Sequence, residues 1–110
     1  MITYDDFLKV DIRAGRVISA EVFPEARKPA YRLKIDFGRV IGLKQSSVQI
    51  TEHYKVMDLP GKLIAAVVNF PPKKIAGFSS EVLTLGFPDE NGKVVLVSPD
   101  TEVPLGSRLF

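Results

Sequence analysis

The chain has 110 residues, of which 45% are hydrophobic and none is cysteine, and its formal net charge is +2. This length suits a single domain, residues 1–110, with a buried core. The lack of cysteine excludes disulfides, thiol catalysis and thiolate metal sites. No apolar run approaches the length of a membrane span, and no signal segment opens the sequence. We therefore expect a cytoplasmic protein without membrane insertion.

Positive charge is concentrated in the middle of the sequence. From Arg13 to Lys74 there are 12 Lys and Arg residues against 5 Asp and Glu, whereas the two ends together hold 3 basic and 8 acidic residues. This asymmetry predicts one positively charged face, which would attract an anionic partner, nucleic acid above all. The alternative interpretation is that the lysines only keep the protein soluble.

The N-terminal part predicts a short helix followed by a long strand. Thr3 and Asp6 have the spacing of a capping box, which favours a helix start at this point. Residues 11–22 then alternate between polar and apolar, as a half-buried strand does. Gly15 lies in the middle of this strand and suggests a bulge or a tight bend.

The next segment predicts a second strand, a third strand and a helix. Residues 31–37 alternate most regularly, and Arg32 and Lys34 lie on the polar face of that strand. Another short strand is expected to begin at residues 41–44. Ser46 with Gln49 repeats the capping-box pattern and predicts a short helix from Ser46 to Tyr54.

The C-terminal half predicts further strands separated by proline-rich turns. Residues 63–68 are apolar on both faces, so both faces need cover. Further strands are expected at 81–85 and 94–97. Phe-Pro pairs at 23–24, 70–71 and 87–88 are expected to stop strands, with the phenylalanines as plugs of the barrel ends.

Three strands, a short helix and two more strands form the pattern of an OB fold, an all-β, five-stranded Greek-key barrel. The N-terminal helix, the strand at 94–97 and the apolar tail at 103–110 are extensions beyond that barrel. These extensions or a second subunit would cover the outer face of strand 63–68.

No pattern for catalysis is evident. His53 has no second histidine or thiolate with metal-ligand spacing, so we interpret it as a helix-end or surface residue. No glycine-rich phosphate loop and no nucleophile elbow is present. The sequence predicts no enzyme activity, no metal and no cofactor.

Three segments resemble the CsaA family, small bacterial and archaeal proteins described as secretion-related chaperones with tRNA-binding capability. They are KQSSVQIT (Lys44–Thr51), VVNFPPKKIAGFSSEVLTLG (Val67–Gly86) and VPLGSRLF (Val103–Phe110). The chain is also similar to the tRNA-binding OB domain found on some methionyl-tRNA synthetases, although Val82-Leu83 stands where that family has Gly-Met. The positions that match this wider family are Asn69, Lys73, Lys74, Ser80 and Glu81.

The resemblance implies an OB-fold homodimer that binds tRNA and unfolded polypeptides or preproteins without catalysis. A tRNA-binding module without a chaperone role is the alternative. Basic, polar and aromatic residues near the expected strand 2–3 face are the RNA-binding candidates. They are Arg32, Lys34, Lys44, Asn69, Lys73, Lys74, Phe78 and Ser80.

The candidates for peptide binding are the apolar side chains Phe70, Ile75 and Phe78. Several candidates also have a structural interpretation. Phe78 either stacks on a base or plugs the barrel, and Asn69 either contacts RNA or satisfies turn backbone. Lys73 and Lys74 either bind phosphate or belong to a solvated turn.

Overall fold

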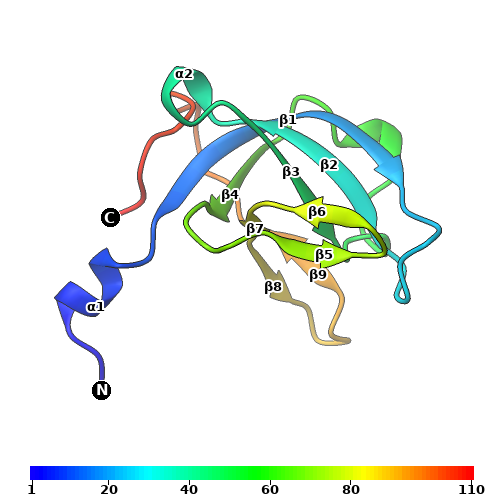
Figure 1. Ribbon diagram of the computed structural model, residues 1–110, viewed down its shortest axis with the longest axis horizontal. Helices are drawn as coiled ribbons and strands as arrows, with labels where there is room; N and C mark the ends of the chain where they lie inside the picture. Colours follow the sequence, from blue (N-terminus) through cyan, green and yellow to red (C-terminus); the bar gives the residue numbers. More distant parts are fainter.

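The computed structural model describes residues 1–110, and its centre is a five-stranded antiparallel sheet in the order β3-β2-β1-β4-β7. Figure 1 shows this sheet curling into a nearly closed barrel, with the hairpins β5–β6 and β8–β9 packed at its side. The predicted OB fold is confirmed. The elements are α1 (Tyr4–Leu8), β1 (Ile12–Val22), β2 (Tyr31–Asp36), α2 (Gly38–Ile41), β3 (Leu43–Val48), η1 (Val56–Asp58), β4 (Leu63–Val67), β5 (Lys73–Ile75), β6 (Phe78–Ser80), β7 (Leu83–Thr84), β8 (Gly86–Pro88) and β9 (Val94–Leu96).

The long strand β1 is paired with β4 along its first half and with β2 along its second. The bulge lies between Val17 and Ser19, and not at Gly15 as the sequence suggested. Gly15 serves another purpose, since a Cβ at that position would lie 2.7 Å from side-chain atoms of both Ile35 and Phe37. The glycine therefore lets β1 cross closely over the core.

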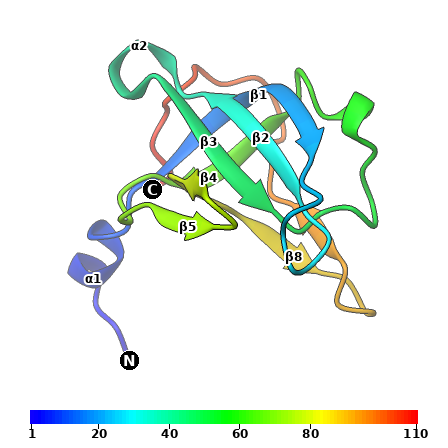
Figure 2. The same ribbon diagram turned by 45° about the vertical axis from the view of Figure 1, so that its right-hand side comes forward.

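The core fills the barrel interior and includes Leu33, Ile35, Phe37 and Ile64. All five residues of β4 are buried, as its apolar sequence requires. One side of β4 is covered by the C-terminal segment, because the Ala65 N–H donates to the Val97 carbonyl at 3.1 Å. The same segment then runs beside β1, and Figure 2 shows it along that strand.

The predicted helix from Ser46 to Tyr54 is wrong. Ser46 lies inside β3 and is fully buried, so its hydroxyl does not cap a helix. Between β3 and β4 the structure has a turn and the short 3-10 helix η1. The helix α2 lies one connection earlier, between β2 and β3, where the sequence indicated only a strand end.

The strand expected at 81–85 is shorter than predicted, because only Leu83 and Thr84 pair with β4. Residues 78–80 pair instead with 73–75 and form a hairpin that the sequence pattern does not indicate. The prediction of phenylalanine plugs holds for Phe23, which is 3% exposed. It is wrong for Phe70 and Phe87, whose side chains are largely exposed.

Helix α1 begins with the predicted capping box, in which the Thr3 side chain and the Asp6 side chain each bond the other residue's backbone N–H. None of its residues is buried, and Figure 1 shows it projecting from the barrel. No helix of the structure is both long enough and apolar enough to cross a membrane.

The barrel closes through a seam, by which we mean residues 45–47 of β3 and residues 80–84 opposite them. The Ser46 hydroxyl donates to the Val82 carbonyl at 3.2 Å and accepts from the Thr84 hydroxyl at 2.9 Å. One backbone bond also crosses the seam, from Glu81 N–H to the Gln45 carbonyl at 2.8 Å. Side chains thus supply much of the closure that a strand ladder would otherwise give.

Ser46→Ala is expected to lower the free energy of unfolding by about 1–3 kcal/mol, because it leaves buried polar groups unpaired. Urea unfolding measures this. Ser47→Ala is the matched control, since that neighbouring hydroxyl makes no hydrogen bond to the protein, and it should cost less than about 0.5 kcal/mol. Equal effects of the two substitutions would contradict the role of the Ser46 hydroxyl in closure.

Candidate nucleic-acid interface

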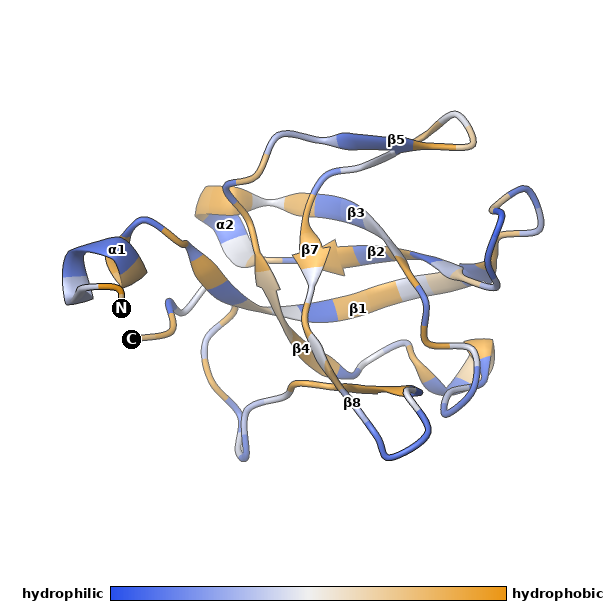
Figure 3. Ribbon diagram, turned by 90° about the horizontal axis from the view of Figure 1, so that it is seen from below, coloured by the Kyte–Doolittle hydropathy of each residue, from blue (hydrophilic) through white to orange (hydrophobic).

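The β5–β6 hairpin carries most of the residues that the sequence singled out. Its register pairs Lys73 with Ser80, Lys74 with Ser79, and Ile75 with Phe78. The turn between the strands consists of Ala76 and Gly77, with φ of 48° and 82°. Positive φ at both central residues is the signature of a type I′ turn, which matches the twist of a hairpin. Figure 3 shows β5 as hydrophilic, with an apolar tip.

The hairpin is fixed to β3 by side chains of the seam and its neighbours. The Gln45 side-chain amide donates to the Ser79 carbonyl at 2.8 Å, and the Ser47 N–H donates to the Ser80 hydroxyl at 3.0 Å. The Glu81 carboxylate accepts from the Gln45 N–H at 3.0 Å. Cations on β5 therefore hold a defined position relative to the barrel.

A first row of polar side chains crosses the outer surface of β2 and β3 and continues onto the hairpin. Lys34 is opposite Gln45 in the register, and side chains at opposed positions share one face of a sheet. Gln45 reaches Ser79, and Ser79 is opposite Lys74. We call Lys34, Gln45, Ser79 and Lys74 the outer row.

A second row lies beside it, and we call Arg32, Ser47, Ser80 and Lys73 the inner row. Arg32 is opposite Ser47, Ser47 bonds Ser80, and Ser80 is opposite Lys73. The two rows place two cations on β2 and two on β5.

Arg32 is held by its neighbours. Its Nε lies 3.1 Å from a carboxylate oxygen of Glu21, in an ion pair whose geometry leaves that buried N–H without a hydrogen bond. Its guanidinium carbon lies 5.0 Å from the ring centre of Phe23 and 6.0 Å from that of Phe78. Arg32 therefore offers an incoming anion less free charge than a lysine at the surface would.

Lys34, Lys73 and Lys74 differ from Arg32 because they are exposed and have no acidic partner within ion-pair distance. Their ammonium groups are free to meet phosphates as point charges. The cations without an ion-pair partner are Arg27, Lys28, Lys34, Arg39, Lys44, Lys55, Lys62, Lys73 and Lys74.

Three other candidates lie apart from the rows. Lys44 is opposite the buried Ile35, so it lies on the other face of β3 from the outer row. The Asn69 side chain accepts from the Asp11 N–H at 3.0 Å and donates to the Lys9 carbonyl at 2.8 Å, which ties the end of β4 to the start of β1. Phe78 is half-buried.

The Phe78 ring packs edge-on against Phe23, with 5.4 Å between ring centres. This contact leaves only part of the ring open to a partner. The aromatic contribution of this surface to base stacking is therefore small, and its positive charges are the groups best placed to bind an anionic ligand.

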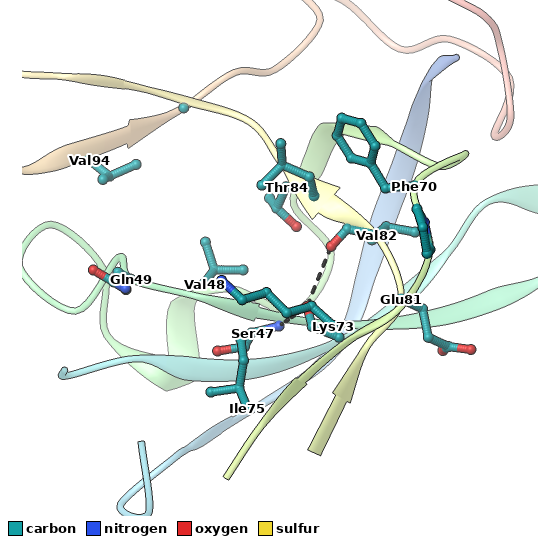
Figure 4. Close-up of a pocket in the computed structure, with 14 residues that line it drawn as sticks. Ser47, Val48, Gln49, Phe70, Lys73, Ile75, Glu81, Val82, Thr84 and Val94 are labelled. Carbon is teal, nitrogen blue, oxygen red and sulfur yellow. Dashed lines mark hydrogen bonds between the residues drawn. The ribbon is translucent and has the colours of Figure 1, made fainter. Parts of the chain in front are cut away.

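A groove of about 640 Å³ lies beneath the hairpin. Phe70 and Ile75 line it, together with Val48, Val94 and Lys73, and Figure 4 shows these side chains around one hollow. Two of the three peptide-binding candidates, Phe70 and Ile75, are thus brought together, whereas Phe78 does not line this groove.

The sequence did not point to Gln45, Ser47 or Ser79, which link the cations of each row. Gln45 and Ser47 belong to the stretch KQSSV, in which alternate positions face outward. Because the inward position is a serine, the stretch lacks the apolar alternation of a strand.

His53 forms a pair with Asp89 at 2.7 Å between Nε2 and a carboxylate oxygen. The Lys93 N–H and then His53 hold the pKa of the Asp89 carboxyl below its usual value. This contact ties the β8–β9 hairpin to the turn after β3. No group of three or more His, Cys, Asp or Glu side chains is arranged to hold a metal ion.

Comparison with known proteins gives concordant results. Residues 12–108 match the family described as putative tRNA binding domain. Chaperone CsaA structures from Bacillus anthracis and Picrophilus torridus are both 55% identical, with TM-scores of 0.94 and 0.93. They match all of this chain, over 99% and 100% of their own chains. The methionine–tRNA ligase of Porphyromonas gingivalis is 37% identical over 98% of this chain.

The chain therefore belongs to the putative tRNA binding domain family. Within that family it is similar over its whole length to the two CsaA chaperones, which confirms the resemblance seen in the sequence. It spans only 15% of the length of the Porphyromonas ligase, so the match concerns one part of that enzyme.

Ala76→Asn is expected to raise the free energy of unfolding by about 0.5–1 kcal/mol, because asparagine tolerates positive φ and Asn-Gly is the preferred type I′ pair. Urea unfolding measures this as well. Gly77→Ala is the opposite control: a Cβ there meets nothing within 4 Å, so any decrease in stability reports backbone strain alone. Destabilisation by Ala76→Asn would contradict the type I′ assignment.

Proposed function

We propose that this chain is a non-catalytic protein of the CsaA type that binds tRNA through the outer row and its surroundings. The observation that carries the proposal is the position of Lys34 and Lys74, two exposed lysines without acidic partners at the two ends of one row. The family description and the ligase relatives support tRNA as the ligand.

The surface favours contact with the RNA backbone over the reading of bases. Lysines and the serine and glutamine groups between them suit phosphate and sugar oxygens. The one aromatic candidate, Phe78, is half-buried against Phe23. Binding should then follow the shape and charge of a folded RNA, as recognition of helical RNA generally does.

A second function, supported by the groove beneath the hairpin, is that of a chaperone. The similar structures from Bacillus anthracis and Picrophilus torridus carry that description. We propose that the protein holds unfolded polypeptides, including preproteins during export, and does so in the cytoplasm. Exposed apolar residues on α1 and at the C-terminus, such as Tyr4 and Phe110, favour a homodimer in which a second copy covers them.

Lys34→Ala combined with Lys74→Ala is expected to weaken tRNA binding and to flatten its salt dependence. The slope of log K against log salt should fall in magnitude by about 0.7–0.9 for each phosphate that the variant no longer neutralises. Fluorescence anisotropy of labelled tRNA at several salt concentrations measures this.

The matched control is Lys55→Ala combined with Lys62→Ala, which removes the same charge from the segment around η1. Figures 1 and 2 show that segment away from β5. The control should leave the slope within error of the original protein. An unchanged slope in the Lys34 and Lys74 variant would remove the outer row from the RNA interface.

A further inference from the structure

An unpaired strand edge borders the groove beneath the hairpin. The Gln45 carbonyl accepts from the Glu81 N–H, and the Gln45 N–H donates to the Glu81 carboxylate, so both backbone groups of Gln45 point away from β2. Backbone groups two residues apart in a strand point to the same side. The backbone groups of Ser47 and Gln49 therefore point the same way as those of Gln45, to the side of β3 that borders the groove.

The seam uses only part of this edge. The Ser47 N–H is bonded to the Ser80 hydroxyl at 3.0 Å, whereas the backbone of Gln49 makes no hydrogen bond. The Ser47 carbonyl and both backbone groups of Gln49 are thus left without protein partners. Alternation continues beyond the assigned strand, since Val48 and Ile50 are buried while Gln49 is exposed. The segment 47–49 is a short, extended and open edge.

The groove beside this edge combines apolar walls with one free charge. Ile75 and Phe70 come from the hairpin side, and Val94 from β9. Lys73 has no ion-pair partner, and Figure 4 shows its side chain extending across the groove toward Val48. Gln49 and Phe70 lie at opposite ends of the same view.

We propose that the groove binds an extended polypeptide segment as an added strand along Ser47–Gln49, with a carboxylate of that segment at Lys73. The inference rests on the proposed polypeptide-holding function and assigns its site. An added strand supplies amide groups at the spacing that the open edge requires. Alternate apolar side chains of the segment would contact Ile75 and Phe70.

The same features disfavour RNA as the occupant of the groove. A nucleic acid lacks the alternating amide donors and acceptors that pair with a strand edge, and phosphates gain nothing from apolar walls. Lys73 ends the inner row at this point, so a polypeptide in the groove and an RNA on the rows would both approach its ammonium group.

The test uses a fluorescein-labelled seven-residue peptide of alternating valine and threonine with a central glutamate, and anisotropy as the readout. Two N-methylated forms block alternate sets of its amides, so that only one set can pair with β3. One form should bind at least about tenfold more weakly, while the other stays within about threefold of the parent. Equal retention by both forms would overturn strand addition.

The charge contact has its own matched variants. Lys73→Ala should weaken binding of the glutamate peptide several-fold and should have no further effect on a glutamine version. Lys74→Ala removes the same charge from the other face of the hairpin and should leave peptide binding unchanged. Equal weakening in the two variants would show a general attraction to positive charge and would contradict a carboxylate site at Lys73.

A separate arm distinguishes failure of the site from failure of the proposed function. Reduced, carboxymethylated lactalbumin serves as the unfolded protein, and the seven-residue peptide should displace it from this chain. If the unfolded protein binds and the peptide neither binds nor displaces it, the function stands and the groove is not its site. If neither ligand binds, the polypeptide-holding function and the groove assignment both fail.

Discussion

Closure of the barrel at the seam is the constraint on which the binding surfaces depend. A full strand ladder between β3 and the segment opposite would have sealed this side of the barrel. Instead, most hydrogen bonds across the seam involve side chains, namely the Ser46 hydroxyl, the Ser80 hydroxyl and the Glu81 carboxylate. Because side chains reach farther than paired backbones, the hairpin is fixed above β3 while the end of β3 stays open.

Two adjacent surfaces follow from this arrangement. Outside, the outer row places the unpaired Lys34 and Lys74 at its two ends, across β2, β3 and the hairpin, in a form suited to an RNA backbone. Underneath, the groove offers apolar walls and free amide groups, in a form suited to an extended chain. Lys73 belongs to the inner row and also lines the groove, so occupation of one surface should weaken the other wherever both ligands use that ammonium group.

The sequence predicted those parts of the fold whose pattern comes from apolar burial. The alternation of residues 31–37, the all-apolar β4 and the capping box at Thr3 each correspond to an observed element. The helix predicted from Ser46 is wrong because a buried serine with polar partners interrupts the apolar alternation of a strand and resembles a helix N-cap in sequence. The β5–β6 hairpin was not predicted because strands of three residues are too short to show the two-residue hydrophobic period of a strand. For the site, the sequence named the lysines but not Gln45, Ser47 and Ser79, whose role depends on contacts between distant segments.

The most direct test of the seam is native-state hydrogen exchange in Ser80→Ala, with Ser79→Ala as the control. In Ser80→Ala we expect faster exchange of the Ser47 amide and of the hairpin amides, with little change in those that join β1 and β2. We also expect weaker tRNA binding although no charge is removed, because Lys74 is no longer held in a fixed position. Unchanged hairpin protection together with unchanged tRNA affinity would contradict the claim that the seam positions the binding surface.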